Sequence, residues 1–133
     1  MAMTSVADTR LLLTLQFPPS EGVRDRVQAF IRKEMSRNII LPSIVLTEFV
    51  KVAGSRIGIE ATVRTINLLK ERGMNVKPID EELAMQAGKL LLKHKDVPFA
   101  DALIASFALS KIAEYVLSDD LHFEKLGTKS KWF

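Results

Sequence analysis

Two carboxylates occupy positions where the surrounding sequence favours apolar side chains. On a helix, Asp101 shares a face with Val97, Ile104, Ala105 and Ala108. Glu48 has helical neighbours that are also apolar, namely Ile44, Val45 and Val52. Burying an unpaired carboxylate is unfavourable, so such an acid is usually neutralised, hydrogen-bonded or bound to a cation. The alternatives are an acid stabilised at a helix N-terminus for Asp101 and a partly exposed residue at the edge of an amphipathic helix for Glu48.

Three further acids directly follow short apolar segments that are typical of strands. Asp8 follows the first segment, and Asp119 and Asp120 follow the fourth. Taken singly, each is typical of a helix N-cap. In a doubly wound sheet, however, the ends of the first and fourth strands lie side by side at the crevice where ligands bind. These acids would converge there.

The helices that carry Glu48 and Asp101 would then have to flank that crevice. Four or five carboxylates in one small volume repel one another strongly unless a cation is bound among them. Carboxylate oxygens favour Mg²⁺ or Mn²⁺, and such a site suits phosphate chemistry.

The elements that position these acids alternate along the chain as strands and helices, which indicates an α/β fold with a mainly parallel sheet covered on both faces. We expect strands at residues 3–7, 38–41, 74–76, 115–117 and 129–133. We expect helices at residues 9–17, 20–37, 43–54, 60–72, 80–95, 99–113 and 120–126. Trp132 and Phe133 are expected to close the edge of the sheet.

Composition places the chain among ordinary soluble proteins and predicts one domain over residues 1–133. It has 133 residues, of which 47% are hydrophobic and 26% charged, with a net charge of +3 and no cysteine. Disulfides, thiolate zinc sites and cysteine nucleophiles are excluded. We expect a cytoplasmic protein, because no signal peptide or membrane span is visible. His94 and His122 are too few for a zinc site and are expected at the surface, with His122 near the proposed site.

Four motifs together resemble the PIN domain ribonucleases, especially the VapC-type toxins of toxin–antitoxin pairs. They are Asp8-Thr9 after a short strand, LTEF with Glu48, PFADALIASFA with Asp101, and SDDLHF with Asp120. Each motif is weak alone, but all four occur in the family's order and spacing over nearly the whole chain. The resemblance implies a three-layer α/β/α fold whose central five-stranded parallel sheet has the order 3-2-1-4-5.

The resemblance also implies a divalent-metal-dependent endoribonuclease with Asp8, Glu48, Asp101 and Asp120 as its acids. We expect Asp8 and Asp101 to hold the principal Mg²⁺ or Mn²⁺ ion and Asp120 a second one. Glu48 would position or deprotonate water. Asp119 could substitute or assist as a metal ligand, while Thr9 and Ser118 match hydroxyl positions that orient carboxylates or contact phosphate. One departure is Arg10, which stands where the family more often has a small polar residue.

The implied partners are an RNA substrate, an antitoxin whose basic residue could pair with the carboxylates, and a second copy of the chain. Apolar residues of the segments 58–69 and 83–92 could supply a homodimer interface or belong to the core. Basic residues could follow an RNA backbone or simply be solvated: Arg10, Lys51, Arg56, Lys93, Lys95, Lys125, Lys129 and Lys131.

Two other functions deserve comparison with the nuclease. One is a catalytically silent PIN-like module that binds RNA or protein, although such a module has no need of four mutually repelling acids. The other is a phosphatase-like α/β protein, which would need a D-x-D segment that Asp8-Thr9-Arg10 lacks.

Overall fold

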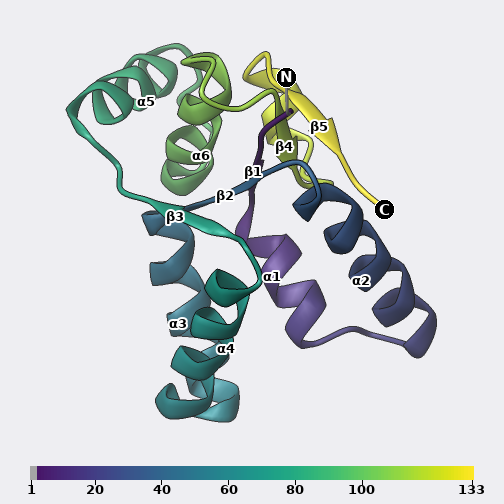
Figure 1. Ribbon diagram of the computed structural model, residues 1–133. Coiled ribbons are helices and arrows are strands. Elements are labelled where there is room, and N and C mark those ends of the chain that lie inside the picture. Colours follow the sequence, from purple (N-terminus) through teal and green to yellow (C-terminus); the bar gives the residue numbers. More distant parts are fainter. Residues whose placement is uncertain (1–2) are drawn as a thin grey trace.

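The computed structural model describes residues 3–133 and contains a five-stranded sheet between two groups of helices (Figure 1). The strands are β1 (Ser5–Ala7), β2 (Ile39–Pro42), β3 (Asn75–Lys77), β4 (Tyr115–Leu117) and β5 (Lys129–Lys131). They lie in the order β3-β2-β1-β4-β5, and every adjacent pair is parallel. The predicted fold class and strand order are confirmed.

Helices connect every strand to the next. They are α1 (Thr9–Gln16), α2 (Glu21–Met35), α3 (Ser43–Ile57), α4 (Ile59–Glu71), α5 (Glu81–Lys93), α6 (Phe99–Leu109) and α7 (His122–Lys125). Helices α1 to α4 gather on one side of the sheet, and α5 and α6 on the other (Figure 1), while the short α7 contacts α6 and β5. The chain changes sides after β3, which makes the boundary between β1 and β4 the switch point of the sheet.

Two of the helix starts follow directly from their capping residues. The Ser20 hydroxyl accepts a hydrogen bond from the backbone N–H of Val23 at 3.1 Å, and Asp80 accepts one from Leu83 at 2.9 Å. These bonds satisfy amide groups that have no partner within the helix. The predicted starts of α2 and α5 are therefore confirmed to within one residue.

Helix α6 ends four residues earlier than the sequence indicates, at Leu109 instead of Ala113. Lys111 has a left-handed backbone conformation with φ 61°. The N–H of Ile112 then donates to the carbonyl of Phe107 at 3.0 Å, and that of Lys111 to Ala108 at 3.1 Å. This is the Schellman ending of a helix, which glycine normally marks. The apolar run gave no such signal, so the prediction was too long.

The last strand is also shorter than predicted, because β5 ends at Lys131. Trp132 and Phe133 leave the sheet and stack on each other, with ring centroids 4.8 Å apart. Phe133 also contacts Phe30 of α2 at 6.1 Å. The final aromatic pair therefore packs against a helix beside the edge strand.

The centre of the sheet is buried, as expected for parallel strands covered on both faces. The fully buried side chains include Val6 of β1, Ile40 and Leu41 of β2, and Val116 and Leu117 of β4. Phe49 of α3 and Phe107 of α6 pack in the core on opposite sides of the sheet, and both are fully buried. This packing fixes the ends of β1 and β4, which carry the acids. Among residues 3–133, no helix is long and apolar enough to cross a membrane.

Candidate metal centre

Asp8 lies at the centre of the switch point. Ala7 and Leu117 are register partners in β1 and β4, and the backbone N–H of Asp8 continues this pairing by donating to Leu117 at 3.4 Å. The Asp8 residue is only 4% exposed, and its Oδ2 accepts a hydrogen bond from the Ser118 hydroxyl at 2.6 Å. The first residues after two neighbouring strands are therefore joined side chain to side chain.

Burial raises the pKa of Asp8 above its ordinary value of 3.8, and the charges of Asp120 and Glu48 raise it further. Hydrogen bonds from the Ser118 hydroxyl and the backbone of Thr9 act in the opposite direction. The carboxylate therefore stands in an environment that disfavours its negative charge. A nearby cation would reverse that preference.

Glu48 reaches the same place from α3. The buried residues Val45, Phe49 and Ala53 face the core from this helix, and Glu48 lies half-buried beside them. Its Oε1 accepts a hydrogen bond from the Thr9 hydroxyl at 2.5 Å. Thr9 is the first residue of α1, so the side chain that follows Asp8 in the sequence holds the second acid.

Asp101 approaches from the other side of the sheet, in the first turn of α6. Its side chain is 13% exposed. Burial raises its pKa from 3.8 to about 6, with further contributions from the charges of Asp8 and Asp120, while the hydrogen bond and charge of His122 lower it. Four acids from separate segments thus influence one another electrostatically: Asp8, Glu48, Asp101 and Asp120.

Asp120 is fixed by the loop after β4. Its backbone N–H donates to the Ser118 hydroxyl at 3.0 Å, and its Oδ1 accepts a bond from the backbone N–H of His122 at 3.0 Å. Ser118 therefore links two of the acids, because the same hydroxyl donates to Asp8. The sequence assigned this serine only a general role in orienting carboxylates.

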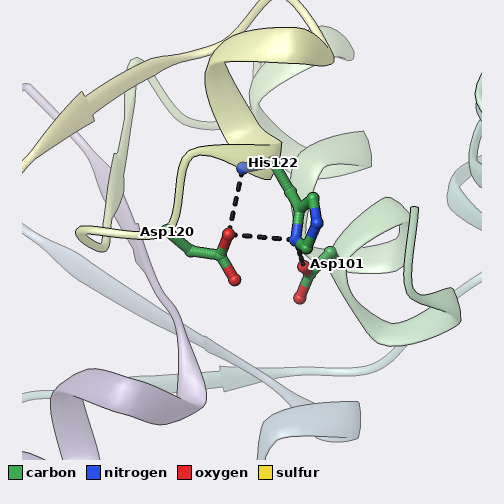
Figure 2. Close-up of side chains that lie close together, drawn as sticks. All are labelled: Asp101, Asp120 and His122. Carbon is green, nitrogen blue, oxygen red and sulfur yellow. Dashed lines mark hydrogen bonds and ion pairs between the residues drawn. The ribbon is translucent and has the colours of Figure 1, made fainter. Parts of the chain in front are cut away.

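His122 was expected near this site, but its contacts with two of the acids were not predicted. Figure 2 shows its ring between two carboxylates, where Nδ1 lies 3.1 Å from Oδ2 of Asp101 and 3.0 Å from Oδ1 of Asp120. One potential ligand atom from each of these residues lies within 4.8 Å of the others. Its side chain is 34% exposed, so it lies at the surface and also belongs to the carboxylate cluster. The available signal was the spacing of Asp120 and His122, which suits a turn in which the aspartate caps a following N–H.

Asp119 does not point into this cluster. It forms a two-pronged ion pair with Arg10, with Oδ1 2.6 Å from Nε and Oδ2 3.0 Å from Nη2. The side chains are 56% exposed for Arg10 and 37% exposed for Asp119. Of the two adjacent aspartates, Asp120 is thus the one placed beside Asp101 and His122.

The donor set fits a divalent cation. Oxygen ligands from carboxylates are preferred by Mg²⁺ and Mn²⁺, and one imidazole nitrogen is compatible with Mn²⁺ and other transition metals. Burial and mutual repulsion raise the pKa values of Asp8 and Asp101, so a bound cation would stabilise the ionised cluster. The fold and site define a doubly wound α/β protein with an acidic centre at its switch point.

Comparison with known proteins identifies the family to which the chain belongs. The sequence profile of the PIN domain matches residues 6–129, so the chain belongs to the PIN domain family. The family comprises nucleases, which act as hydrolases on nucleic acids. No curated protein matches the chain significantly in sequence.

Similar solved structures share this fold over nearly their whole length. The Mycobacterium tuberculosis toxin VapC20, described as cleaving the sarcin–ricin loop, has a TM-score of 0.77 and 17% identity, with 93% of this chain and 95% of that chain covered. VapBC-1 from nontypeable Haemophilus influenzae has a TM-score of 0.69 and 25% identity, covering 98% and 97%. DNA-bound VapBC from Salmonella typhimurium has a TM-score of 0.73 and 23% identity, covering 98% of each chain.

Proposed function

We propose that this protein is a divalent-metal-dependent endoribonuclease and the toxin of a toxin–antitoxin pair. The observation that carries the proposal is the meeting of four acids at one switch point: one directly after β1, one on α3, one on α6 and one in the loop after β4. A catalytically silent binding module would gain nothing from a cluster whose own charges oppose ionisation. A metal-dependent nuclease needs such a cluster, because the carboxylates hold the cation that polarises the phosphate and activates water.

We assign the cation to Asp8, Asp101 and Asp120, with His122 as a further potential ligand. When bound, Mg²⁺ or Mn²⁺ would polarise the scissile phosphate and lower the pKa of a nearby water molecule. Asp8 is held for this role by the Ser118 hydroxyl, and Asp120 by the backbone N–H of His122. Both carboxylates therefore keep a defined orientation before any ligand arrives.

Glu48 is assigned the role of general base. The Thr9 hydroxyl engages one of its oxygens, Oε1, and thereby orients the carboxylate toward the cluster. In the proposed reaction a water oxygen bonds to phosphorus, the bond from phosphorus to the leaving ribose oxygen breaks, and the proton of the water passes to Glu48. The leaving oxygen then takes up a proton from solvent.

The toxin role and its partners are supported by the similar proteins. VapC20 is described as a toxin that cleaves the sarcin–ricin loop, and the Haemophilus and Salmonella structures are described as VapBC. By analogy we infer an antitoxin whose basic side chain pairs with the carboxylates. An RNA substrate would place the protein in the cytoplasm.

A homodimer is also proposed, because two helices expose apolar side chains. On α4, Ile59 and Val63 are 55% and 43% exposed, and on α5, Met85 and Leu92 are 60% and 76% exposed. Burial of such side chains against a second copy would remove apolar surface from water. Sedimentation equilibrium of the wild type tests this expectation.

The function is tested by incubating structured RNA with the wild type and with Asp101→Asn, each with Mn²⁺, Mg²⁺ or excess chelator. Asp25→Asn on the exposed surface of α2 is the matched control. We expect cleavage only by the wild type and the control, and only with metal. Equal activity of all three proteins under every condition would indicate a contaminant and refute the proposal. A wild type that binds RNA tightly but does not cleave it, with or without metal, would favour the silent binding module.

A further inference from the structure

A groove with a volume of about 250 Å³ lies between α1 and α3, next to the acidic centre. Its lining residues come from both helices and from Phe17, which directly follows α1: Arg10, Leu13, Thr14, Phe17, Val52 and Arg56. Arg10 follows Asp8 by two positions and its guanidinium pairs with Asp119, the residue before Asp120, so the groove begins at the rim of the carboxylate cluster. A polymer bound at the cluster could therefore continue directly into this groove.

The charged residues lining the groove carry one sign. Arg10 and Arg56 are both exposed, and among the residues described no carboxylate contributes to the lining. The guanidinium of Arg56 lies over the Phe17 ring, 4.0 Å from its centroid, which holds the cation at the groove surface. Arg10 and Arg56 thus lie along a groove that begins at the acidic centre.

Arg10 is oriented by Asp119, whose two oxygens bind Nε and Nη2. A guanidinium has five N–H donors in a fixed plane, so these two bonds leave three donors for another acceptor. Asp119 therefore fixes the orientation of the guanidinium, while the remaining donors stay available to a ligand. Planar donors of this kind match the oxygens of a phosphate group.

We propose that this groove binds the RNA backbone beside the scissile phosphate, with Arg10 and Arg56 each contacting a phosphate. Asp119 is then a positioning residue that aims Arg10, and not a metal ligand. The proposal rests on the ribonuclease function proposed above and adds the path of the substrate. An RNA strand approaching four carboxylates is repelled by them, and flanking arginines offset that repulsion where the strand must stay bound.

The test measures RNA binding separately from RNA cleavage. Fluorescence anisotropy with a labelled single-stranded RNA, in excess chelator and over a range of salt concentrations, compares the wild type with Arg10→Ala, Arg56→Ala and Asp119→Asn. Arg24→Ala, an exposed arginine of α2, is the matched control. Steady-state cleavage with Mn²⁺ is measured on the same proteins, and circular dichroism verifies that each variant is folded.

We expect Arg10→Ala and Arg56→Ala each to weaken RNA binding by about 3- to 10-fold and to reduce the salt slope by about 0.7, the value for one lost phosphate contact on a single strand. Asp119→Asn should weaken binding less than Arg10→Ala, because the arginine remains but loses its orientation. For Arg56→Ala, KM should rise while kcat changes little. Arg24→Ala should match the wild type.

The proposal is overturned if Arg10→Ala and Arg56→Ala bind RNA with the affinity and salt slope of Arg24→Ala, or if the wild type does not bind RNA at all. It is equally overturned if both variants lose affinity for an acidic peptide and none for RNA, which would make the groove a protein-docking surface. Failure of the ribonuclease function has a different signature, because the wild type would then show no metal-dependent cleavage whatever the binding results.

Discussion

Replacing Asp101 with asparagine should stabilise the metal-free protein near neutral pH while abolishing its activity. The folded-state pKa of Asp101 is about 6, against an ordinary value of 3.8. This difference corresponds to about 3 kcal/mol by which folding disfavours the ionised carboxylate. Asparagine carries no charge and still offers an oxygen to His122, so we expect a gain in unfolding free energy of about 1 to 3 kcal/mol.

The pH dependence of this effect has a definite sign. Between about pH 4 and pH 6 the folded chain binds the Asp101 proton more tightly than the unfolded chain does, so wild-type stability falls as the pH rises through this window. The raised pKa of Asp8 acts in the same direction. Asp101→Asn removes the contribution of Asp101 to this dependence of the unfolding free energy on pH. The stability advantage of the variant over the wild type should therefore disappear below about pH 4.

The assay is urea unfolding followed by circular dichroism, for both proteins, in chelator and across the acidic range. Saturating Mn²⁺ should then stabilise the wild type by about 2.7 kcal/mol at 100 times Kd and leave Asp101→Asn nearly unchanged. A variant that is less stable than the wild type near neutral pH in chelator, or that keeps the full wild-type slope, would refute the reasoning.

Three other substitutions test separate parts of the site and fold. Glu48→Gln should lower kcat by about 10²- to 10³-fold with little change in stability, because the Thr9 bond is retained and the base is lost; cleavage kinetics and thermal melts check both statements. His122→Ala should raise the pKa of Asp101, because the hydrogen bond and charge of His122 lower that pKa. When Mn²⁺ binding is measured by calorimetry at decreasing pH, the affinity of this variant should begin to fall at a higher pH than that of the wild type. His94→Ala should leave this pH dependence unchanged. Lys111→Gly should raise the unfolding free energy by up to about 1 kcal/mol in urea titrations, because the φ of 61° suits glycine; a decrease would contradict the assigned helix ending.

The sequence predicted the fold well because its signals were local. Apolar runs defined the strands, and capping residues such as Ser20 and Asp80 marked helix starts. The left-handed turn at Lys111 was missed, since its cause is a pair of backbone hydrogen bonds to Ala108 and Phe107 that no residue type announces. The departure of Trp132 and Phe133 from the last strand depends on contacts with α2, which lies about a hundred residues earlier in the chain.

The sequence identified the acids of the cluster and the hydroxyls of Thr9 and Ser118 that orient two of them, but it gave no sign of the contacts that His122 and Arg10 make. Carboxylates at apolar positions stand out in any sequence, and topology brings them together. The position of His122 between two acids depends on the turn after Asp120, and the pairing of Arg10 with Asp119 depends on how α1 meets the loop after β4. Both are tertiary arrangements of residue types that are also common on solvated surfaces.

The acids at the switch point hold the catalytic cation in the mechanism proposed above. Calorimetric titration of Mn²⁺ into the wild type, Asp101→Asn and Asp119→Asn, with cleavage of RNA measured on the same samples, tests it most directly. We expect Asp101→Asn to lose metal binding and cleavage together, while Asp119→Asn keeps a metal affinity close to that of the wild type. Unchanged Mn²⁺ binding by Asp101→Asn, or cleavage that persists in excess chelator, would contradict it.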